Sequence, residues 1–170
     1  KNVIEAVQST SVNRLVHMSS VVAVGASFDR HTILNEESPY TLSHLDLGYF
    51  ETKRKAEQLV LGACKRGELN AVAVNPSTIY GPGDAKKGSR KVMLKVARGT
   101  FPYYTPGGVS VIDVEDVIDG LLNALTLGKT GERYILSGEN ITIKTLFDWI
   151  AEFAGVHPPW IYLPKPVVHL

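Results

Sequence analysis

The sequence of 170 residues has one cysteine, almost no net charge and no long apolar run. Because Cys64 is alone, no disulfide can form within the chain, which fits a reducing compartment, and we expect a cytoplasmic location. A formal net charge of +1 gives no electrostatic basis for binding nucleic acid or an anionic membrane. No apolar stretch approaches the roughly 18 residues that a membrane span needs. Residues 1–7 do not have the pattern of a signal peptide and look like the middle of a helix.

The chain instead alternates short apolar runs with segments of helical period, which favours an α/β fold with parallel strands joined by crossover helices. The apolar runs predict strands at 14–20, 71–74, 109–112 and 133–136. Helices are expected over 1–9, 48–66, 91–98, 114–127 and 143–154. Residues 25–46 are polar and without a clear period, so they predict a long loop, a kind of segment that is usually functional or disordered.

Local signals support these boundaries. Asp113 is a good N-cap for the helix that follows it, and Gly67 is a plausible C-cap for the helix before it. The last predicted helix has an apolar stripe of Leu146, Ile150 and Phe153 at helical spacing. His17 lies within an apolar run and is interpreted as a packed histidine rather than a ligand.

Tyr49 and Lys53 are four residues apart, so on a helix they project from the same face, one turn apart. A free phenol has a pKa of roughly 10 and is a poor base at neutral pH. A fixed ammonium nearby favours the phenolate and lowers that pKa toward the range that a general acid/base needs. The alternative is an ordinary aromatic residue on an amphipathic surface helix.

Polar residues follow two of the predicted strands. Ser19 and Ser20 end the first, and Asn75-Pro76-Ser77 ends the second. In open parallel sheets ligands bind outside the carboxyl ends of the strands, so both groups lie on the edge where a ligand would bind. The helix with Tyr49 and Lys53 is the crossover between these two strands.

Together these segments resemble the extended short-chain dehydrogenase/reductase (NAD-dependent epimerase/dehydratase) family. The resemblance covers essentially the whole chain, and its branch with dihydroflavonol-reductase-like proteins and hopanoid-associated sugar epimerases is the most similar. The residues that carry it, in order, are 1–6, Ser19–Gly25, Glu37-Ser38-Pro39, Tyr49-x-x-x-Lys53, 75–84 (NPSTIYGPGD), 108–117 and 131–140.

The resemblance implies a Rossmann-like, doubly wound parallel sheet that lacks its N-terminal βαβ units, with a small C-terminal substrate lobe. Residues 1–80 would be the C-terminal half of the dinucleotide-binding domain. Residues 81–170 would hold substrate-lobe segments with a returning strand and helices. The family's phosphate-binding glycine-rich turn should precede Asn2, so we expect the chain to be part of a longer protein.

The resemblance also implies roles for individual residues. Tyr49 would donate or accept the proton of a substrate hydroxyl or carbonyl, and Lys53 would lower the phenol's pKa and bind the nicotinamide ribose. Ser20 would polarise the same substrate oxygen; we choose it over Ser19 because it stands five residues before Gly25, the spacing usual in the family. Pro76 and Ser77 would line the nicotinamide. The alternatives are a satisfied hydroxyl at a strand end for the serines and a structural turn for Pro76 and Ser77.

The implied cofactor is NAD or NADP, and the implied partner is a small-molecule substrate; no metal ligands are assigned, and the family allows a homodimer. Neither Gly81-Pro82-Gly83 nor Gly107-Gly108 can replace the glycine-rich turn, because neither joins a strand to a helix with free N–H groups. The basic loop with Lys86, Lys87, Arg90 and Lys91 is either solvated or contacts phosphate.

Two departures bear on the reaction. Nucleotide-sugar enzymes of the family commonly have Val-Tyr-Gly where this chain has Ala23-Val24-Gly25, and they carry an arginine that contacts the pyrophosphate where this chain has Gly107-Gly108-Val109-Ser110. Without a guanidinium, a pyrophosphate loses its best bidentate partner. This favours an oxidoreductase for a ketone or secondary alcohol over a nucleotide-sugar epimerase or dehydratase. A non-catalytic dinucleotide-binding or scaffold member is the third hypothesis.

Overall fold

The structure, a computed structural model, describes residues 1–29, 31–83, 90–164 and 166. By contacts the chain divides into two compact units, residues 1–79 with 112–138 and residues 80–111 with 139–170. Asp84 of the 75–84 segment and Lys86 and Lys87 of the basic loop lie outside the described residues. That the second unit serves as a substrate lobe stays a prediction.

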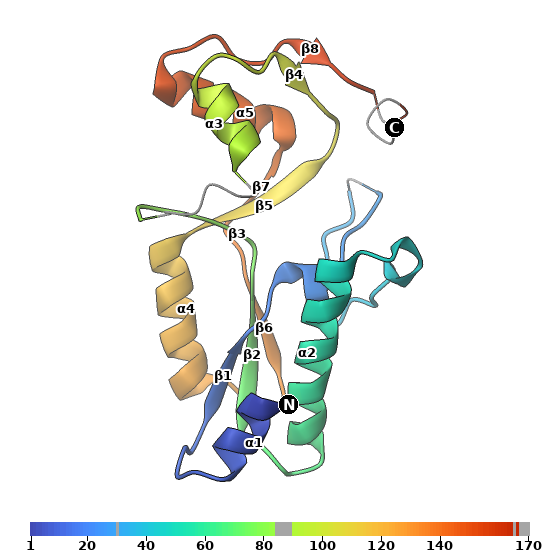
Figure 1. Cartoon of the computed structure of the whole chain (residues 1–170), viewed down its shortest axis with the longest axis vertical. Coiled ribbons are helices and arrows are strands. Elements are labelled where there is room, and N and C mark those ends of the chain that lie inside the picture. Colours follow the sequence, from blue (N-terminus) through green and yellow to red (C-terminus); the bar gives the residue numbers. More distant parts are fainter. Residues whose placement is uncertain (30, 84–89, 165, 167–170) are drawn as a thin grey trace. The chain divides into compact units, whose positions relative to one another are not determined.

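The first unit is built on a parallel sheet. Its strands are ordered β1 (Leu15–Met18), β2 (Ala71–Pro76) and β6 (Arg133–Leu136). Figure 1 shows α2 (Gly48–Lys65) and α4 (Val114–Leu127) on opposite sides of this sheet, with α1 (Asn2–Gln8) near its lower end. Every residue of β2 is buried, as expected of a central strand whose two faces are both covered. The α/β architecture with parallel strands therefore agrees with the prediction.

Alternate residues of β2 pack on opposite faces of the sheet. The cluster on one face joins β2 to α4 and consists of Val72, Val74 and Ala124. The cluster on the other face joins β2 to α2 and consists of Val60, Ala63, Leu69 and Ala71. By this alternation Asn75 belongs to the α2 face, and it is fully buried there.

The predicted helix ends are confirmed. The Asp113 side chain accepts a hydrogen bond from the Glu115 N–H at 2.8 Å and so caps α4. Helix α2 ends in a Schellman motif, in which the Glu68 N–H donates to the Ala63 carbonyl at 3.0 Å. Gly67 has φ +73° in this motif, a conformation that strongly favours glycine.

In the second unit, β5 (Gly108–Asp113) pairs antiparallel with β7 (Glu139–Thr142). Helix α3 (Lys91–Ala97) packs against α5 (Ile143–Ala154), and β4 (Tyr103–Tyr104) pairs with β8 (Ile161–Tyr162). The buried core of this unit consists of Val96, Leu146, Phe147 and Ala151. Strand β3 (Thr78–Tyr80) leads into the unit, next to β5 in the sheet order.

The structure differs from the sequence-based expectations in two ways. Phe153 is 96% exposed, so its assignment to the apolar stripe of α5 is wrong. The buried face of α5 centres between Leu146 and Phe147, which leaves Phe153 at its margin in the last turn. Strands β3, β4 and β8 were not predicted, because two or three residues are too few to show a pattern. Strand β7 was not predicted because its sequence, ENIT, is mostly polar. No helix in the described ranges is both long and apolar enough to cross a membrane.

The burial of β2 predicts a stability difference between two apolar truncations. Val72→Ala should lower the free energy of unfolding by about 2 kcal/mol, because Val72 is fully buried and truncation leaves a cavity. Leu127→Ala, at a side chain that is 78% exposed, should change it by less than about 0.5 kcal/mol. Urea unfolding of the full-length protein measures both. Equal losses would contradict the central position of β2.

Candidate active site

Lys53 lies at the carboxyl end of β1. Its Nζ is 3.4 Å from the Met18 carbonyl oxygen and 3.5 Å from that of Ser19. Both contacts are long, so the ammonium keeps donor capacity for a further acceptor. The lysine thus joins the first half of α2 to the strand end at which the sequence predicts the site.

Tyr49 stands one turn before Lys53 on the same face of α2. The side chain is 60% exposed, so its phenol is open to a ligand. Its ring meets the ring of Phe50 edge to face, with 6.4 Å between the centroids. The predicted tyrosine–lysine face of the helix is therefore present at the carboxyl end of β1.

Ser20 begins the short helix η1 (Val21–Ala23) that follows β1. Its Oγ accepts a long hydrogen bond of 3.4 Å from the Val22 N–H, which leaves the hydroxyl hydrogen to donate elsewhere. Ser19 is only 4% exposed, and its Oγ is buried without a partner among the described residues. Gly25, at the end of the serine–glycine spacing, has φ +126°, so the backbone there requires glycine.

Pro76 and Ser77 leave β2 at its carboxyl end. Pro76 is paired in register with Leu136, and the Ser77 N–H donates to the Leu136 carbonyl at 2.9 Å. The backbone donor of Ser77 is thus already used. Its hydroxyl is buried and has no partner within the described ranges, so it has hydrogen-bonding capacity for a ligand group.

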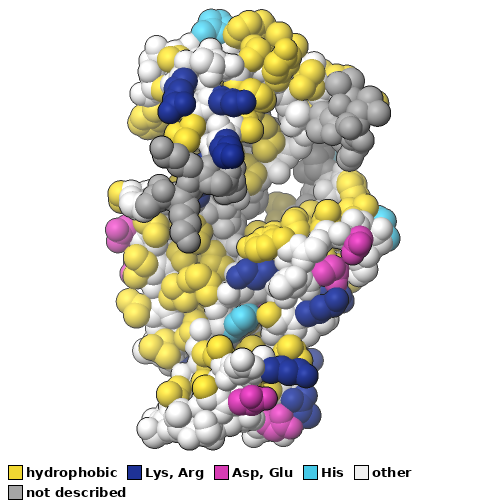
Figure 2. Space-filling view, in the orientation of Figure 1, with side chains coloured by type: hydrophobic (Ala, Val, Ile, Leu, Met, Phe, Trp, Pro, Cys, Tyr) yellow, Lys and Arg dark blue, Asp and Glu magenta, His cyan; other side chains and the backbone are white. Residues whose placement is uncertain are grey.

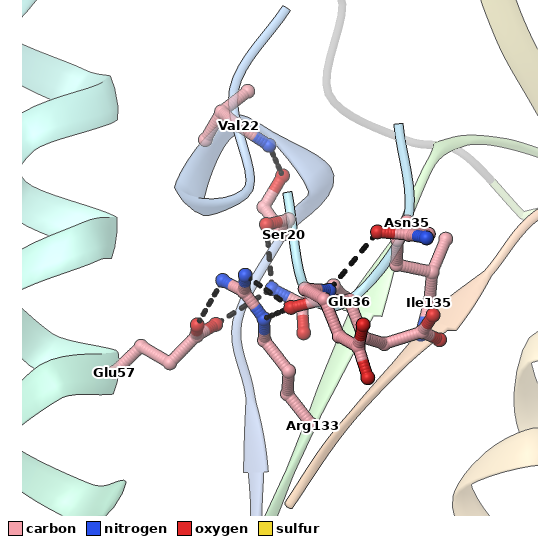
Figure 3. A network of polar contacts seen from close by, with 9 residues as sticks. Ser20, Val22, Asn35, Glu36, Glu57, Arg133 and Ile135 are labelled. Atoms are coloured by element: carbon pink, nitrogen blue, oxygen red, sulfur yellow. Dashed lines mark hydrogen bonds and ion pairs between the residues drawn. The ribbon is translucent and has the colours of Figure 1, made fainter. Parts of the chain in front are cut away.

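The structure adds a buried polar network that the sequence analysis missed (Figure 3). Glu57 of α2 is 3% exposed; its carboxylate accepts from Asn75 Nδ2 at 2.6 Å and pairs with Arg133 Nη1 at 3.2 Å. Asn75 Nδ2 also donates to the Ser20 carbonyl at 2.9 Å. A signal was available: Glu57 continues the Tyr49–Lys53 face by one more turn, and Arg133 is a charged residue in a predicted buried strand.

The later part of the long loop, at Tyr40, is held against α2. The guanidinium of Arg54 lies 4.3 Å from the Tyr40 ring centroid and 3.8 Å from the Glu51 carboxylate. Burial, together with the neighbouring Glu51 carboxylate, raises the pKa of Tyr40. This part of the loop is therefore ordered by contacts with the first two turns of α2.

Residues 1–113 match the 3-beta hydroxysteroid dehydrogenase/isomerase family. The chain belongs to this family. Its members are NAD(P)-dependent enzymes of the extended short-chain dehydrogenase/reductase type, so the predicted family and class are confirmed. The first unit, with its parallel sheet between α2 and α4, is the Rossmann-like fold expected of such proteins.

Two curated relatives match nearly the whole chain. A Synechocystis protein named as a dihydroflavonol 4-reductase is 34% identical over 94% of this chain and 47% of its own length. Sterol demethylase protein B of Methylococcus capsulatus is 33% identical over 90% of this chain and 46% of its own. The chain thus spans about half the length of the curated relatives it matches.

Solved structures share the fold. The protein gox2253 superposes with a TM-score of 0.90 at 36% identity, covering 97% of this chain and 50% of that one. PA4631, a nucleoside-diphosphate-sugar epimerase from Pseudomonas aeruginosa, has a TM-score of 0.86 at 25% identity and covers 98% and 54%. RMD from the same organism, complexed with NADPH, has a TM-score of 0.73 at 21% identity, covers 96% and 59%, and shows the fold alone.

The residues present fit the nicotinamide end of such a cofactor. The buried Ser77 hydroxyl lacks a partner among the described residues, and the Lys53 ammonium has only long contacts with two carbonyl oxygens. Both can bind the amide and ribose hydroxyl groups of a nicotinamide nucleoside. In the described part of the chain, no group of three His, Cys, Asp or Glu side chains could hold a metal ion.

His17, the packed histidine of β1, couples this region to pH. Burial lowers the pKa of His17 from its ordinary value of 6.5; Glu57 opposes this shift and Lys53 adds to it. The folded state therefore favours the neutral imidazole. The unfolded state then binds more protons as the pH falls through 6.5, and stability falls with it.

We accordingly expect His17→Gln to weaken the loss of stability in mild acid. The free energy of unfolding of the full-length protein should fall less in the variant than in the wild type between about pH 8 and about pH 5.5. His31→Gln, at an exposed position, is the control. Parallel curves for His17→Gln and the wild type would show that the folded state does not favour the neutral imidazole of His17.

Proposed function

We propose that the protein is an NAD(P)-dependent oxidoreductase that interconverts a secondary alcohol and a ketone. The observation that supports this most directly is the contact of Lys53 Nζ with the Met18 and Ser19 carbonyls, at 3.4 and 3.5 Å. Through it the helix face with Tyr49 stands over the strand end that Ser20 follows. When bound, the nicotinamide supplies the hydride acceptor or donor.

The chain's own residues would handle the proton. Ser20 donates a hydrogen bond to the substrate oxygen and orients it. Tyr49 removes the hydroxyl proton during oxidation and returns it during reduction, as a general acid/base does. The ammonium of Lys53 stabilises the negative charge on the phenol oxygen and binds the ribose hydroxyls. Pro76 and Ser77 line the nicotinamide.

The family and the relatives support a proposal for the substrate class. Three findings favour an alcohol or ketone on a fused or linked ring system: the hydroxysteroid family, a relative named as a dihydroflavonol 4-reductase and another named sterol demethylase protein B. We therefore propose a 3β-hydroxysteroid as the first substrate to test. A homodimer and a cytoplasmic location stay predictions.

A second candidate is a nucleotide-sugar epimerase or dehydratase, because the solved neighbour PA4631 is named as an epimerase. Against it, Gly107-Gly108-Val109-Ser110 offers no guanidinium to a pyrophosphate. The two reactions differ in whether the nicotinamide cofactor is reduced in net terms. Oxidation of a 3β-hydroxysteroid by the full-length protein should form one reduced nicotinamide per ketone. Interconversion of a nucleotide sugar without net cofactor reduction would overturn the oxidoreductase assignment in favour of the epimerase.

Tyr49→Phe should abolish turnover, lowering kcat by roughly 10²–10⁴-fold, because the phenylalanine cannot transfer the proton. Cofactor binding, measured by fluorescence titration, should change little, since the ring is retained. The matched control is Tyr134→Phe, which removes a phenol whose oxygen accepts from the Lys129 N–H, on the α4 face of the sheet and so on the opposite face from α2. Full activity of Tyr49→Phe would refute its assignment as the acid/base.

A further inference from the structure

Glu57, Asn75 and Arg133 place a carboxylate, an amide and a guanidinium on the α2 face of the sheet. Glu57 is 3% exposed and Asn75 is fully buried, while the Arg133 side chain is 20% exposed. Removing an ion pair from water costs several kcal/mol per ion, so such a pair adds little net stability, and apolar residues of similar volume often do as well. Net stability therefore gives little reason for this network, and its effect lies in the groups that it holds in place.

What it holds is the main chain at Ser20. Asn75 Nδ2 donates one hydrogen to Glu57 Oε2 at 2.6 Å and the other to the Ser20 carbonyl at 2.9 Å. The Ser20 carbonyl also accepts from the Ala23 N–H at 3.0 Å, the bond that begins η1. Together these two donors fix the peptide plane that follows Ser20.

The Glu57 carboxylate determines which way the Asn75 amide points. The carboxylate and the Ser20 carbonyl are both acceptors, so only the NH₂ end of the amide can face them. A flipped amide would bring its own oxygen against both and leave the carboxylate with one donor fewer. The negative charge of Glu57 thus selects the orientation in which Asn75 can bind Ser20.

Arg133 completes the network on its other side. Its Nη1 lies 3.2 Å from Glu57 Oε1, and its Nε donates to the Glu36 carbonyl at 2.8 Å. Glu36 Oε1 accepts from the Ile135 N–H at 2.8 Å. Figure 3 shows Arg133 between Glu57 and Glu36, with Ser20 above them. The guanidinium balances the buried charge and joins the long loop to β6.

Ser20 is therefore held on both sides. Its own carbonyl is bound by Asn75, and the carbonyl of the preceding Ser19 is contacted by Lys53 Nζ at 3.5 Å. With both flanking peptides held, the direction of the Ser20 Cα–Cβ bond is set, and so is the region that its hydroxyl can reach. A hydroxyl aimed wrongly by about 1 Å can cost roughly 10²-fold in rate.

We propose that Glu57 and Asn75 are positioning residues that aim the Ser20 hydroxyl at the substrate oxygen, Glu57 by orienting the amide and Asn75 by binding the Ser20 carbonyl. This rests on the proposed function, since it assumes that Ser20 acts on the substrate. Glu57 would then affect turnover without touching the substrate, and its effect would depend on the Ser20 hydroxyl.

The test is a double-mutant cycle in the full-length protein. Glu57→Gln should lower kcat by about tenfold or more, with little change in the KM for the cofactor. In a Ser20→Ala background the same change should alter kcat by less than about threefold, because no hydroxyl remains to be aimed. Glu68→Gln, which breaks the exposed pair of Glu68 with Arg66, is the matched control on the same side of the sheet and should leave kcat unchanged.

A purely structural role for Glu57 gives another pattern. Glu57→Gln would then lower kcat by the same factor with and without the Ser20 hydroxyl, and the proposal would be overturned. If Ser20→Ala leaves kcat unchanged, the role of Ser20 in the proposed function falls, and the proposal falls with it. If Ser20→Ala lowers kcat but Glu57→Gln lowers it by the same factor in both backgrounds, only the positioning role is refuted, and the proposed function stands.

A second variant separates positioning from folding. Glu57→Met with Arg133→Met replaces the ion pair by apolar side chains of similar volume, which often leaves a protein as stable or more stable. Urea unfolding should show a folded protein, while kcat should still fall and the fall should still vanish in the Ser20→Ala background. Undiminished kcat in this folded variant would refute the proposal.

Discussion

A buried carboxylate cannot be left without donors, and Glu57 meets this requirement with partners from two strands. Asn75 of β2 and Arg133 of β6 reach it at 2.6 and 3.2 Å. The helix that carries Glu57 also carries Tyr49 and Lys53, two turns and one turn earlier. The pairing of the carboxylate therefore fixes the rotation and the height of α2 on the sheet, and with them the position of the proposed acid/base.

This constraint explains why the site gathers at one edge of the first unit. Strands β1 and β2 are parallel and end within two residues of each other in register, so Ser20 and Ser77 follow them at the same edge of the sheet. Lys53 closes the arrangement from α2 through the carbonyls at the end of β1. Membership of the hydroxysteroid dehydrogenase/isomerase family supports the proposed role of this geometry in hydride transfer. The chain spans about half the length of the curated relatives it matches.

Much of the first unit could be predicted because its signals are local. The apolar run of β2, the cap at Asp113 and the glycine at Gly67 each follow from a few neighbouring residues. The ion pair of Glu57 with Arg133 could not be predicted, because 76 residues separate its partners and only the sheet order brings them together. The exposure of Phe153 also depends on a contact between distant segments, because the packing of α3 determines which face of α5 is buried.

In the proposed reaction, Ser20 and Tyr49 act on one substrate oxygen. A crystal structure of the full-length protein with oxidised nicotinamide cofactor and a secondary alcohol that the protein oxidises shows whether both residues reach that oxygen. We expect the alcohol oxygen to lie within hydrogen-bond reach, about 2.6–3.2 Å, of both the Ser20 hydroxyl and the Tyr49 phenol. An alcohol oxygen bound to neither of them, in a complex that turns over, would show that these two residues do not act on the substrate.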